Sequence, residues 1–511
     1  MHILGGVIKQ VINLKHGIED STQASPAERQ TEQLENLLKK AKDTAFGKFY
    51  NFEGILEAEN MREEFSKRVP IHEYNEMHDS WWHQQLKYPD ITWPGRPDYF
   101  ARSSGTTGSE PKRIPVTNEM IDSIRSVGIA QLTSLANFDL PPEFFEKQIL
   151  MLGSSTKLDE VDGHEEGEIS GISASNIPGW FDTVYKPGKE IASIPDWDEK
   201  VRRIAEEAPN WDIGAASGIP SWLLLLFKEV LKVNNAKSIH EVWPDFKVYT
   251  TGGVAFEPYR DAFEELFDKE VIIMDTYLAS EGFFAFNARP ETHAMRLATQ
   301  HGVYYEFVPF DKRGFDDEGN ILDCPEVHTL DDVDTETNYA MIISTCSGTW
   351  RYMIGDTVKF ENLEQNEIVI SGRTKHFLNV VGSQLSEDKM NAAVKKVSTD
   401  CGCSIDEFTV AAVRDENGDY FHEWILGVEN GENLDDEDTA RRMDECLKEM
   451  NKNYAVARSK ALKGVKVYGV PVERFYDWHE KSRKKGGQVK TKKLMSEDEF
   501  KEFRDFVLKY S

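Results

Sequence analysis

The feature that most constrains the fold of this chain is a strand–helix–strand pattern between residues 247 and 277. The apolar run KVYTTGG comes first, a helical segment begins near Pro258 with PYRDAFEELF, and the strand-like run VIIMDTY completes the unit. Two strands joined by a helix pair in parallel, and helices then cover the faces of the sheet. The sequence therefore predicts an α/β core built on a parallel sheet.

Two further units are expected along the chain. Between residues 302 and 372, the apolar runs GVYYEFVPF, YAMIIST and EIVISGR alternate with Gly, Asp and Asn, a pattern typical of antiparallel hairpins. After Arg373 a helix from Ser386, two strands, a second helix and the strand VKVYGVPV follow. We therefore expect a large N-terminal domain, residues 1–374, with the parallel-sheet α/β core and a β-rich subdomain. Residues 375–511 would form a small α+β C-terminal domain.

Charge and apolar runs limit the partners of this chain. Its 511 residues include 60 Lys and Arg against 89 Asp and Glu, a formal net charge of -29. Nucleic acids and anionic membranes attract basic surfaces, so we expect neither as a partner. The most concentrated apolar run, Trp222 to Phe227, is far shorter than the ~20 residues that span a bilayer. The five cysteines lack a disulfide-framework pattern, which favours a reducing, cytoplasmic location.

A loop of small and polar residues, RSSGTTGSEPK, runs from Arg102 to Lys112 between two strand-like segments. Glycines let backbone N–H groups approach an anion, hydroxyls add donors and the lysine adds a positive charge, so the loop can bind phosphate. It is not a Walker A loop, and a polar hairpin with turn glycines explains the loop equally well when it is taken alone. The candidate phosphate-binding residues are Ser103, Ser104, Gly105, Thr106, Thr107, Gly108 and Lys112.

Two shorter segments carry further candidate ligands. YLASEGFF, from Tyr277 onward, emerges at the carboxyl end of a strand, where α/β sheets bind ligands. Tyr277 can stack on an aromatic base, Ser280 can hydrogen-bond and Glu281 can hold Mg²⁺ through its oxygens, although a lone glutamate is more often a solvated loop carboxylate. WRYMIGD ends at Asp356, whose carboxylate can accept both hydroxyls of a ribose, with a β-turn aspartate as the commoner alternative.

In this order and at these separations, the three segments resemble the phosphate loop, the adenine and metal motif and the ribose aspartate of the adenylate-forming superfamily, which includes acyl-CoA ligases and luciferases. A fourth segment, ISGRTK, resembles the Gly-Arg hinge motif of that superfamily. Within it, the chain resembles a bacterial-type member of the Gretchen Hagen (auxin-responsive promoter) acyl acid-amido synthetases. This likeness rests on four features. The phosphate loop is one residue longer than in acyl-CoA ligases, so that Ser-Glu separates Gly108 from Pro111. The other three are Thr251-Gly-Gly followed by Glu257-Pro-Tyr259, the segment ASEGFF, and Gln488-x-Lys490.

The resemblance implies an enzyme that uses ATP and Mg²⁺ to convert a small carboxylic acid into acyl-AMP and pyrophosphate, and then transfers the acyl group to an amine, with an amino acid as the expected acceptor. It also implies a mobile small domain that rotates about a hinge near Lys375 between the two steps. The implied roles are catalysis for Lys112, Glu281 and Lys490, metal binding for Glu281, adenine contacts for Gly253, Tyr277, Ala279 and Ser280, and ribose contacts for Asp356 and Arg373.

Two other functions stay open from the sequence. One is an acyl- or aryl-CoA ligase, in which a thiol takes the acyl group, and the other is a catalytically idle nucleotide-binding scaffold. The sequence contains no G-x-S-x-G, H-E-x-x-H or G-x-G-x-x-G motif, so serine hydrolase, zinc protease and dinucleotide-binding functions have no motif support. Single histidines such as His164, beside Glu165 and Glu166, are expected at the surface rather than in a metal site.

Overall fold

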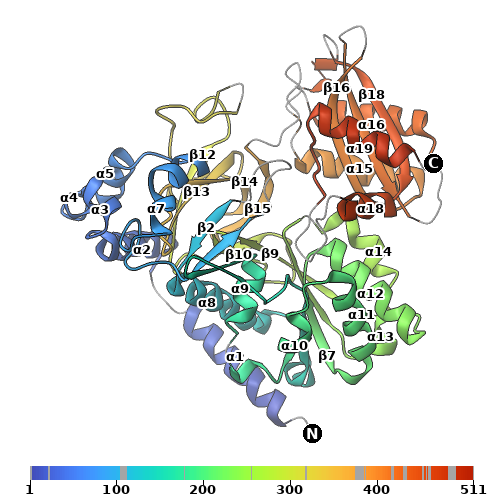
Figure 1. Ribbon diagram of the computed structural model, residues 1–511, viewed down its shortest axis with the longest axis horizontal. Helices are drawn as coiled ribbons and strands as arrows, with labels where there is room; N and C mark the ends of the chain where they lie inside the picture. Colours follow the sequence, from blue (N-terminus) through green and yellow to red (C-terminus); the bar gives the residue numbers. More distant parts are fainter. Residues whose placement is uncertain are drawn as a thin grey trace.

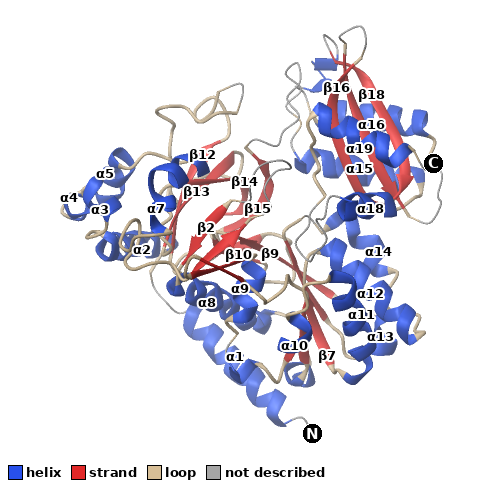
Figure 2. Ribbon diagram, in the orientation of Figure 1, coloured by secondary structure: helices blue, strands red, loops and turns tan. Residues whose placement is uncertain are grey.

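In the residues that the structure describes, the chain folds into three β-sheets with helices packed around them (Figure 1). Figure 2 shows that helix and strand are both distributed along the whole chain, so the expected α/β class is confirmed. The computed structural model describes residues 3–20, 24–103, 112–177, 179–254, 256–316, 319–374, 385, 387–415, 419–429, 434–451, 454–455, 457–458, 462–481 and 491–509.

The main sheet has eleven strands and contains both halves of the expected large domain. In chain order its strands are β3 (Gln148–Met151), β6 (Tyr185–Lys186), β7 (Ile213–Ser217), β8 (Val248–Gly252), β9 (Ile272–Ala279), β10 (Gly282–Phe286), β11 (Met295–Leu297), β12 (Val303–Pro309), β13 (Asn338–Thr345), β14 (Tyr352–Asn362) and β15 (Glu367–Arg373). In space the order is β12-β13-β14-β15-β11-β10-β9-β8-β7-β3-β6.

The direction of these strands changes at β9. β6, β3, β7, β8 and β9 pair in parallel, and β8 with β9 is the predicted strand–helix–strand unit. β12 to β15 pair antiparallel, as the hairpin pattern predicts. The short strand β11 pairs with β10 on one side and β15 on the other, so the β-rich part continues the core sheet instead of forming a separate one.

Helices cover both faces of the parallel half because successive side chains of a strand point to opposite faces. Tyr249 of β8 packs with α11 (Trp197–Glu207), α12 (Pro220–Asn234), α13 (Ile239–Val242), η6 (Glu257–Tyr259) and α14 (Arg260–Glu264). Its neighbour Val248 packs on the other face, with Met274 and the segment of η2 (Leu135–Asn137) and η3 (Pro142–Glu146). This double coverage is what a buried parallel sheet requires.

The N-terminal helices close on the antiparallel half. They are α2 (Pro26–Ala41), α3 (Ala45–Phe49), α4 (Phe52–Leu56), α5 (Met61–Arg68), α6 (Tyr74–Met77), η1 (His78–Trp82) and α7 (His83–Gln85), whereas α1 (Ile3–Asp20) packs against η2 and η3. The indole of Trp350, which precedes β14, lies against Phe46 at 5.9 Å and Phe52 at 4.7 Å between ring centroids. The backbone N–H of His72 also donates to Arg351 O at 2.9 Å. Segments almost 300 residues apart in the chain therefore share one core.

A four-stranded sheet in the order β2-β1-β5-β4 carries the ends of the predicted phosphate loop. Its strands are β1 (Tyr99–Arg102), β2 (Arg113–Val116), β4 (Asp159–Val161) and β5 (His164–Gly167). β1 and β2 pair antiparallel, which confirms the predicted strand–loop–strand arrangement. α9 (Ile169–Ser175) packs against β1. Between residues 117 and 211 the chain also forms α8 (Asn118–Ser134), η4 (Gly179–Phe181), α10 (Gly188–Ala192) and η5 (Ala208–Asn210), of which α10 and η5 pack against α11.

The described residues from 385 onward form what we call the C-terminal unit. It has a three-stranded sheet of β16 (Ile405–Arg414), β17 (Tyr420–Val428) and β18 (Leu462–Pro471). Its helices are α15 (Glu387–Cys401), α16 (Asp436–Met450), α18 (Glu473–Lys481) and α19 (Glu497–Leu508). Its hydrophobic clusters draw only on residues of this unit. The boundary at residue 374 stays a prediction, because residues 375–384 lie outside the described residues.

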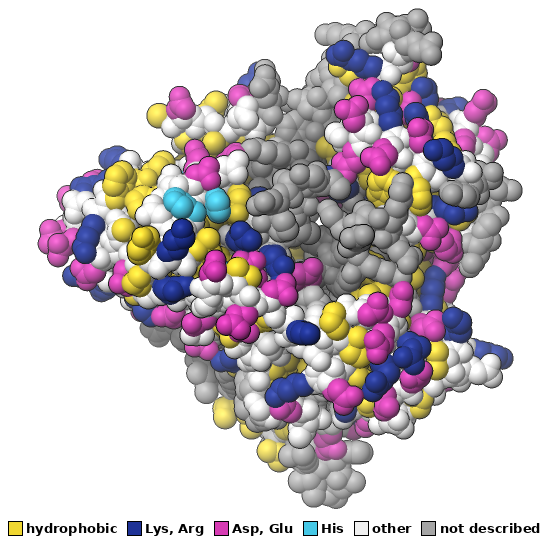
Figure 3. Space-filling model, in the orientation of Figure 1, with side chains coloured by type: hydrophobic (Ala, Val, Ile, Leu, Met, Phe, Trp, Pro, Cys, Tyr) yellow, Lys and Arg dark blue, Asp and Glu magenta, His cyan; other side chains and the backbone are white. Residues whose placement is uncertain are grey.

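Every helix in the described residues is too short or too polar to span a bilayer. All five cysteines lie in the described residues, and none of them forms a disulfide. Figure 3 shows acidic and basic side chains intermixed over the face drawn, without one continuous basic patch.

Candidate active site

Three predicted site residues meet at one edge of the main sheet. Asp356 and Arg373 lie opposite each other across the β14–β15 pair, and the Arg373 guanidinium Nε lies 2.9 Å from Asp356 Oδ1. Tyr277, at the carboxyl end of β9, donates its hydroxyl to Asp356 Oδ2 at 2.7 Å. β10, β11 and β15 separate β9 from β14 in the sheet order, and strands lie ~4.8 Å apart, so the sheet must curve strongly to allow this contact.

Burial and charge fix the protonation of Tyr277 and Arg373. Burial, followed by the neighbouring Asp356 carboxylate, holds the pKa of Tyr277 well above its usual range, so the phenol stays neutral and donates. The Asp356 carboxylate in turn raises the pKa of Arg373. Both carboxylate oxygens thus already accept one hydrogen bond or ion pair. Because a carboxylate has about four acceptor positions, Asp356 retains acceptor capacity for a ligand.

Glu281 lies in the two-residue turn between β9 and β10, where Ala279 pairs with Gly282. It is 8% exposed, so the solvated loop carboxylate considered from the sequence is wrong. Burial raises the pKa of this carboxyl, while the charge of Lys112 opposes the rise. Asp356 and Arg373 also act on it electrostatically, so Lys112, Glu281, Asp356 and Arg373 share one electrostatic neighbourhood. A buried acid whose pKa is raised and which lies among opposite charges is a candidate functional residue.

The donor set at Glu281 fits a magnesium ion that is shared with a ligand. Among the described residues no group of three His, Cys, Asp or Glu side chains is arranged to hold a metal by itself. Nucleotide-bound Mg²⁺, however, needs only one or two carboxylates beside phosphate oxygens. Burial disfavours the charged form of the Glu281 carboxyl, and a bound cation would stabilise that form. Glu281 therefore suits this role.

The structure describes both ends of the predicted phosphate loop. The backbone N–H of Ser103 donates to Lys112 O at 3.0 Å, which closes the loop at its base. Lys112 Nζ lies 5.2 Å from the ring centroid of Tyr74, and the Tyr74 hydroxyl accepts from the backbone N–H of Arg113 at 2.9 Å. The other predicted residues of the loop, Ser104, Gly105, Thr106, Thr107 and Gly108, lie outside the described residues.

Gly253 and its neighbours lie beside this edge. Gly253 follows β8 with φ +84°, a left-handed conformation that favours glycine. A Cβ on the preceding Gly252 would lie 2.5 Å from Thr276 Oγ1, so the close approach of β8 to β9 requires glycine there as well. Ala279 and Ser280 are partly buried at the end of β9. These residues therefore surround the same strand ends as Tyr277.

The basic tail, residues 481–493, contains several lysines that could contact the phosphates, and the structure places two of them elsewhere. Lys490, Gln488 and the hinge residue Lys375 lie outside the described residues. Lys492 Nζ lies 3.0 Å from Glu499, and Lys493 Nζ lies 3.3 Å from Glu407, so these two lysines already have carboxylate partners within the C-terminal unit. Lys490 remains the predicted phosphate ligand of the tail.

A buried cluster on β1, β2 and β5 lies at the two described ends of the loop, and the sequence interpretation missed it. His164 is 4% exposed, so its expected surface position is wrong, and its Nε2 lies 3.0 Å from Oε1 of the buried Glu166. The same Glu166 oxygen lies 3.0 Å from Arg113 Nε, and Arg102 Nη2 donates to Glu166 O at 3.1 Å. Arg102 and Arg113 face each other at the two ends of the loop. The signal in the sequence was the alternation of His164 and Glu166 along one strand face.

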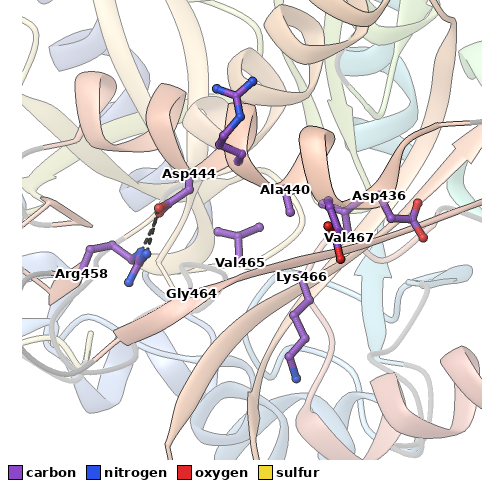
Figure 4. Close-up of a pocket in the computed structure, with 10 residues that line it drawn as sticks. Asp436, Ala440, Asp444, Arg458, Gly464, Val465, Lys466 and Val467 are labelled. Atoms are coloured by element: carbon purple, nitrogen blue, oxygen red, sulfur yellow. Dashed lines mark hydrogen bonds and ion pairs between the residues drawn. The ribbon is translucent and has the colours of Figure 1, made fainter.

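A cavity of about 350 Å³ lies elsewhere, between α16 and β18 of the C-terminal unit. Figure 4 shows the Arg458–Asp444 ion pair at one end and Asp436 and Lys466 at the other. Burial raises the pKa of Asp436, whereas Arg458 and Lys448 help lower that of Asp444 to about 2. None of the predicted site residues that the structure describes lines this cavity.

Curated relatives carry the names of acid–amide ligases. The probable indole-3-acetic acid-amido synthetase GH3.9 of Oryza sativa subsp. japonica is 25% identical over 252 residues, 45% of this chain and 55% of that protein. The indole-3-acetic acid-amido synthetase GH3.2 of Arabidopsis thaliana is 24% identical over 228 residues, 42% of this chain and 41% of that protein. The chain thus matches about half the length of these relatives, or less.

Solved structures share the fold over nearly the whole chain. The GH3.15 acyl acid amido synthetase has a TM-score of 0.77 at 17% identity and covers 98% of this chain and 96% of its own. A 2-hydroxyisobutyryl-CoA ligase in the postadenylation state has a TM-score of 0.61 at 13% identity and covers 96% and 94%. The fold is therefore that of the adenylate-forming ligases.

Family models match in the same order along the chain. The GH3 family N-terminal domain matches residues 14–201 and 159–272, the central domain matches residues 296–371, and the C-terminal domain matches residues 387–499. Together these matches cover well over half of the sequence, so the chain belongs to the GH3 family.

Proposed function

We propose that this protein is an ATP-dependent acyl acid-amido synthetase. It converts a carboxylic acid into acyl-AMP with release of pyrophosphate, and then transfers the acyl group to an amine, most simply that of an amino acid. The observation that carries the proposal is the Tyr277–Asp356–Arg373 contact, with Glu281 and Lys112 in the same electrostatic neighbourhood at the strand ends. Membership of the GH3 family and the printed names of the relatives support it.

In the first half-reaction the protein positions ATP and neutralises developing charge, since phosphoryl and nucleotidyl transfer need little covalent help. Asp356 accepts the ribose hydroxyls with the lone pairs that Tyr277 and Arg373 leave. The amides and hydroxyls of loop residues 103–108, together with Lys112, hold the phosphates. Glu281 and phosphate oxygens would hold Mg²⁺, which would neutralise phosphate charge when bound. Gly253, Tyr277, Ala279 and Ser280 surround the adenine.

In the second half-reaction the amine attacks the acyl carbonyl and AMP leaves with the bonding electron pair. An anhydride of this kind hydrolyses easily, so the site must exclude water while the amine approaches. We propose that the C-terminal unit moves between the two half-reactions about a hinge near Lys375 and that Lys490 contacts the phosphates in the first. Five cysteines that form no disulfide fit a reducing compartment, and we place the protein in the cytoplasm.

The decisive experiment is ATP–pyrophosphate exchange with a panel of carboxylic acids, followed by product analysis with amino acids and with coenzyme A. We expect Mg²⁺-dependent exchange with at least one acid and an amide as the product. Thioester formation without amide would replace the proposal with an acyl- or aryl-CoA ligase. The absence of exchange with every acid, together with retained ATP binding, would instead identify a catalytically idle nucleotide-binding scaffold.

A further inference from the structure

The Glu257-Pro-Tyr259 motif has no role in the proposed chemistry, yet it is one of the places where the C-terminal unit contacts the rest of the protein. It forms η6, a few residues after Gly253 of the predicted adenine loop. β16 and α15 of the C-terminal unit pack against η6, and Figure 1 shows this unit next to α12 and α14. The motif therefore links the nucleotide edge of the main sheet to the C-terminal unit.

The central contact is a buried hydrogen bond between the two units. The Tyr259 hydroxyl donates to Glu407 Oε1 at 2.7 Å, and these residues are 2% and 1% exposed. Burial and the Glu407 carboxylate hold the pKa of Tyr259 well above its usual range, so the phenol stays a donor. A buried carboxylate is costly unless each oxygen finds a donor, and Tyr259 supplies the donor for one of them.

The second oxygen of Glu407 forms an ion pair with Lys493 of the basic tail. Lys493 Nζ lies 3.3 Å from Glu407 Oε2 and 4.4 Å from the ring centroid of Phe408. Lys493 follows the predicted phosphate ligand Lys490 by three residues. A single carboxylate therefore connects the motif beside the adenine loop with the segment that carries Lys490.

Ion pairs between the two units surround this contact. Lys395 of α15 pairs with Glu257, which also binds Arg260 at 2.9 Å, and Lys228 of α12 pairs with Glu429. The side chains of Lys395 and Glu257 are 49% and 41% exposed, so water and salt screen their attraction. The buried Tyr259–Glu407 bond is thus the specific part of the contact, and the ion pairs guide the approach.

We propose that Glu257-Pro-Tyr259 is the docking element that holds the C-terminal unit in the arrangement used for adenylation, with Tyr259 and Glu407 as positioning residues. The proposal rests on the proposed function, which supplies the two half-reactions. A polar contact suits a reversible dock, because water can hydrate both groups once they separate, whereas a large apolar contact would resist separation. Loss of the dock lowers the population of the adenylation arrangement and leaves the other arrangement intact.

The test compares the two half-reactions in Tyr259→Phe, which removes one hydroxyl and keeps the ring. The net contribution of a hydrogen bond to a charged group predicts that the turnover number of ATP–pyrophosphate exchange falls at least about tenfold. Amide formation from chemically prepared acyl-AMP and an amino acid should be unchanged or faster. The matched control is Tyr249→Phe, since the buried Tyr249 hydroxyl donates to Gly218 O at 3.0 Å and does not meet the C-terminal unit. Equal losses in both half-reactions would overturn the proposal.

A rescue experiment separates docking from general damage. Glu257→Lys reverses the charge that faces Lys395, and the double variant Glu257→Lys with Lys395→Glu restores the attraction in the opposite sense. We expect exchange to fall in the single variant and to recover in the double variant. Failure of the pair to recover would contradict the docking role of Glu257. If Tyr259→Phe does not fold, Glu407→Gln provides the same comparison, because it keeps an acceptor oxygen but loses the charge.

Small-angle X-ray scattering of the ligand-free full chain tests docking without any activity. Tyr259→Phe should increase the radius of gyration relative to wild type and to Tyr249→Phe, because the C-terminal unit samples undocked arrangements. An identical radius of gyration would refute the dock. If no acid supports exchange in the wild-type protein, the proposed function fails, while the scattering comparison still decides whether this element docks the C-terminal unit.

Discussion

Replacing Tyr277 by phenylalanine isolates one hydrogen bond of the candidate active site. The change removes only the hydroxyl that donates to Asp356 Oδ2 at 2.7 Å. The ring can keep its packing against Phe284, whose centroid lies 5.1 Å away at an interplanar angle of 71°. Any change in catalysis should therefore come from the carboxylate and not from a cavity.

The size of the effect follows from the partners of Asp356. A hydrogen bond to a charged group contributes about 1.5–3 kcal/mol. The Asp356 side chain is 18% exposed, so water replaces part of the lost donor and the lower end of that range applies. A loss of about 1.4 kcal/mol is a factor of about ten in binding. If Asp356 holds the ribose, KM for ATP should rise about tenfold while KM for the acid stays unchanged.

ATP–pyrophosphate exchange measured against ATP concentration checks this expectation. The matched control is Tyr305→Phe, a fully buried tyrosine whose hydroxyl lies 3.3 and 3.4 Å from two backbone carbonyl oxygens and contacts no carboxylate. This control should lower stability without changing KM for ATP. The reasoning would be refuted if Tyr277→Phe left KM for ATP unaltered, or raised KM for ATP and for the acid equally.

Three other substitutions test separate features. Glu281→Gln removes the buried charge. It should raise the Mg²⁺ concentration that gives half-maximal ATP–pyrophosphate exchange and lower the rate of exchange at least about 100-fold. A Mg²⁺ titration measures both, and an unchanged Mg²⁺ dependence would contradict the metal role. Glu166→Gln weakens the support of Arg113, so urea unfolding should show a loss of about 1–3 kcal/mol, with a higher KM for ATP. Burial lowers the pKa of His422 to about 3. The folded state therefore binds fewer protons than the unfolded state below pH ~6.5, and stability falls as pH decreases toward 3, by up to ~1.4 kcal/mol per unit. His422→Phe should reduce the pH dependence of the unfolding free energy by the contribution of one proton. If urea unfolding showed the same pH dependence for the variant and the wild type, His422 would not be its source.

The local features of the fold were readable because each depends on residues close in sequence. The run before Gly253 and the run that ends at Tyr277 became the parallel pair β8–β9, with a helix between them as the pattern predicts. The loop ends at Arg102 and Arg113 likewise became an antiparallel pair. Apolar periodicity and glycine placement decide such features locally.

The features that were not readable depend on contacts between distant residues. The curvature that brings Tyr277 to Asp356 follows from the pairing of β11 with β15, which no local pattern specifies. His164 is buried where β5 pairs with β1, and its ring centroid lies 4.8 Å from that of Phe100 on the distant strand β1. The hydrophobic pattern of a segment predicts its secondary structure and which of its faces is buried. The pairing of strands distant in sequence decides which polar side chains come into contact.

The packing of Trp350 among the N-terminal helices has a consequence during synthesis on the ribosome. Chains emerge N-terminus first, and Phe46 and Phe52 leave the ribosome long before the indole that covers them. Until about 350 residues have been made, these aromatic rings have no native partner on that side and offer an apolar surface to other chains. The N-terminal helices are therefore the segment that most needs chaperone protection while the protein is made, and a fragment that stops before Trp350 should aggregate.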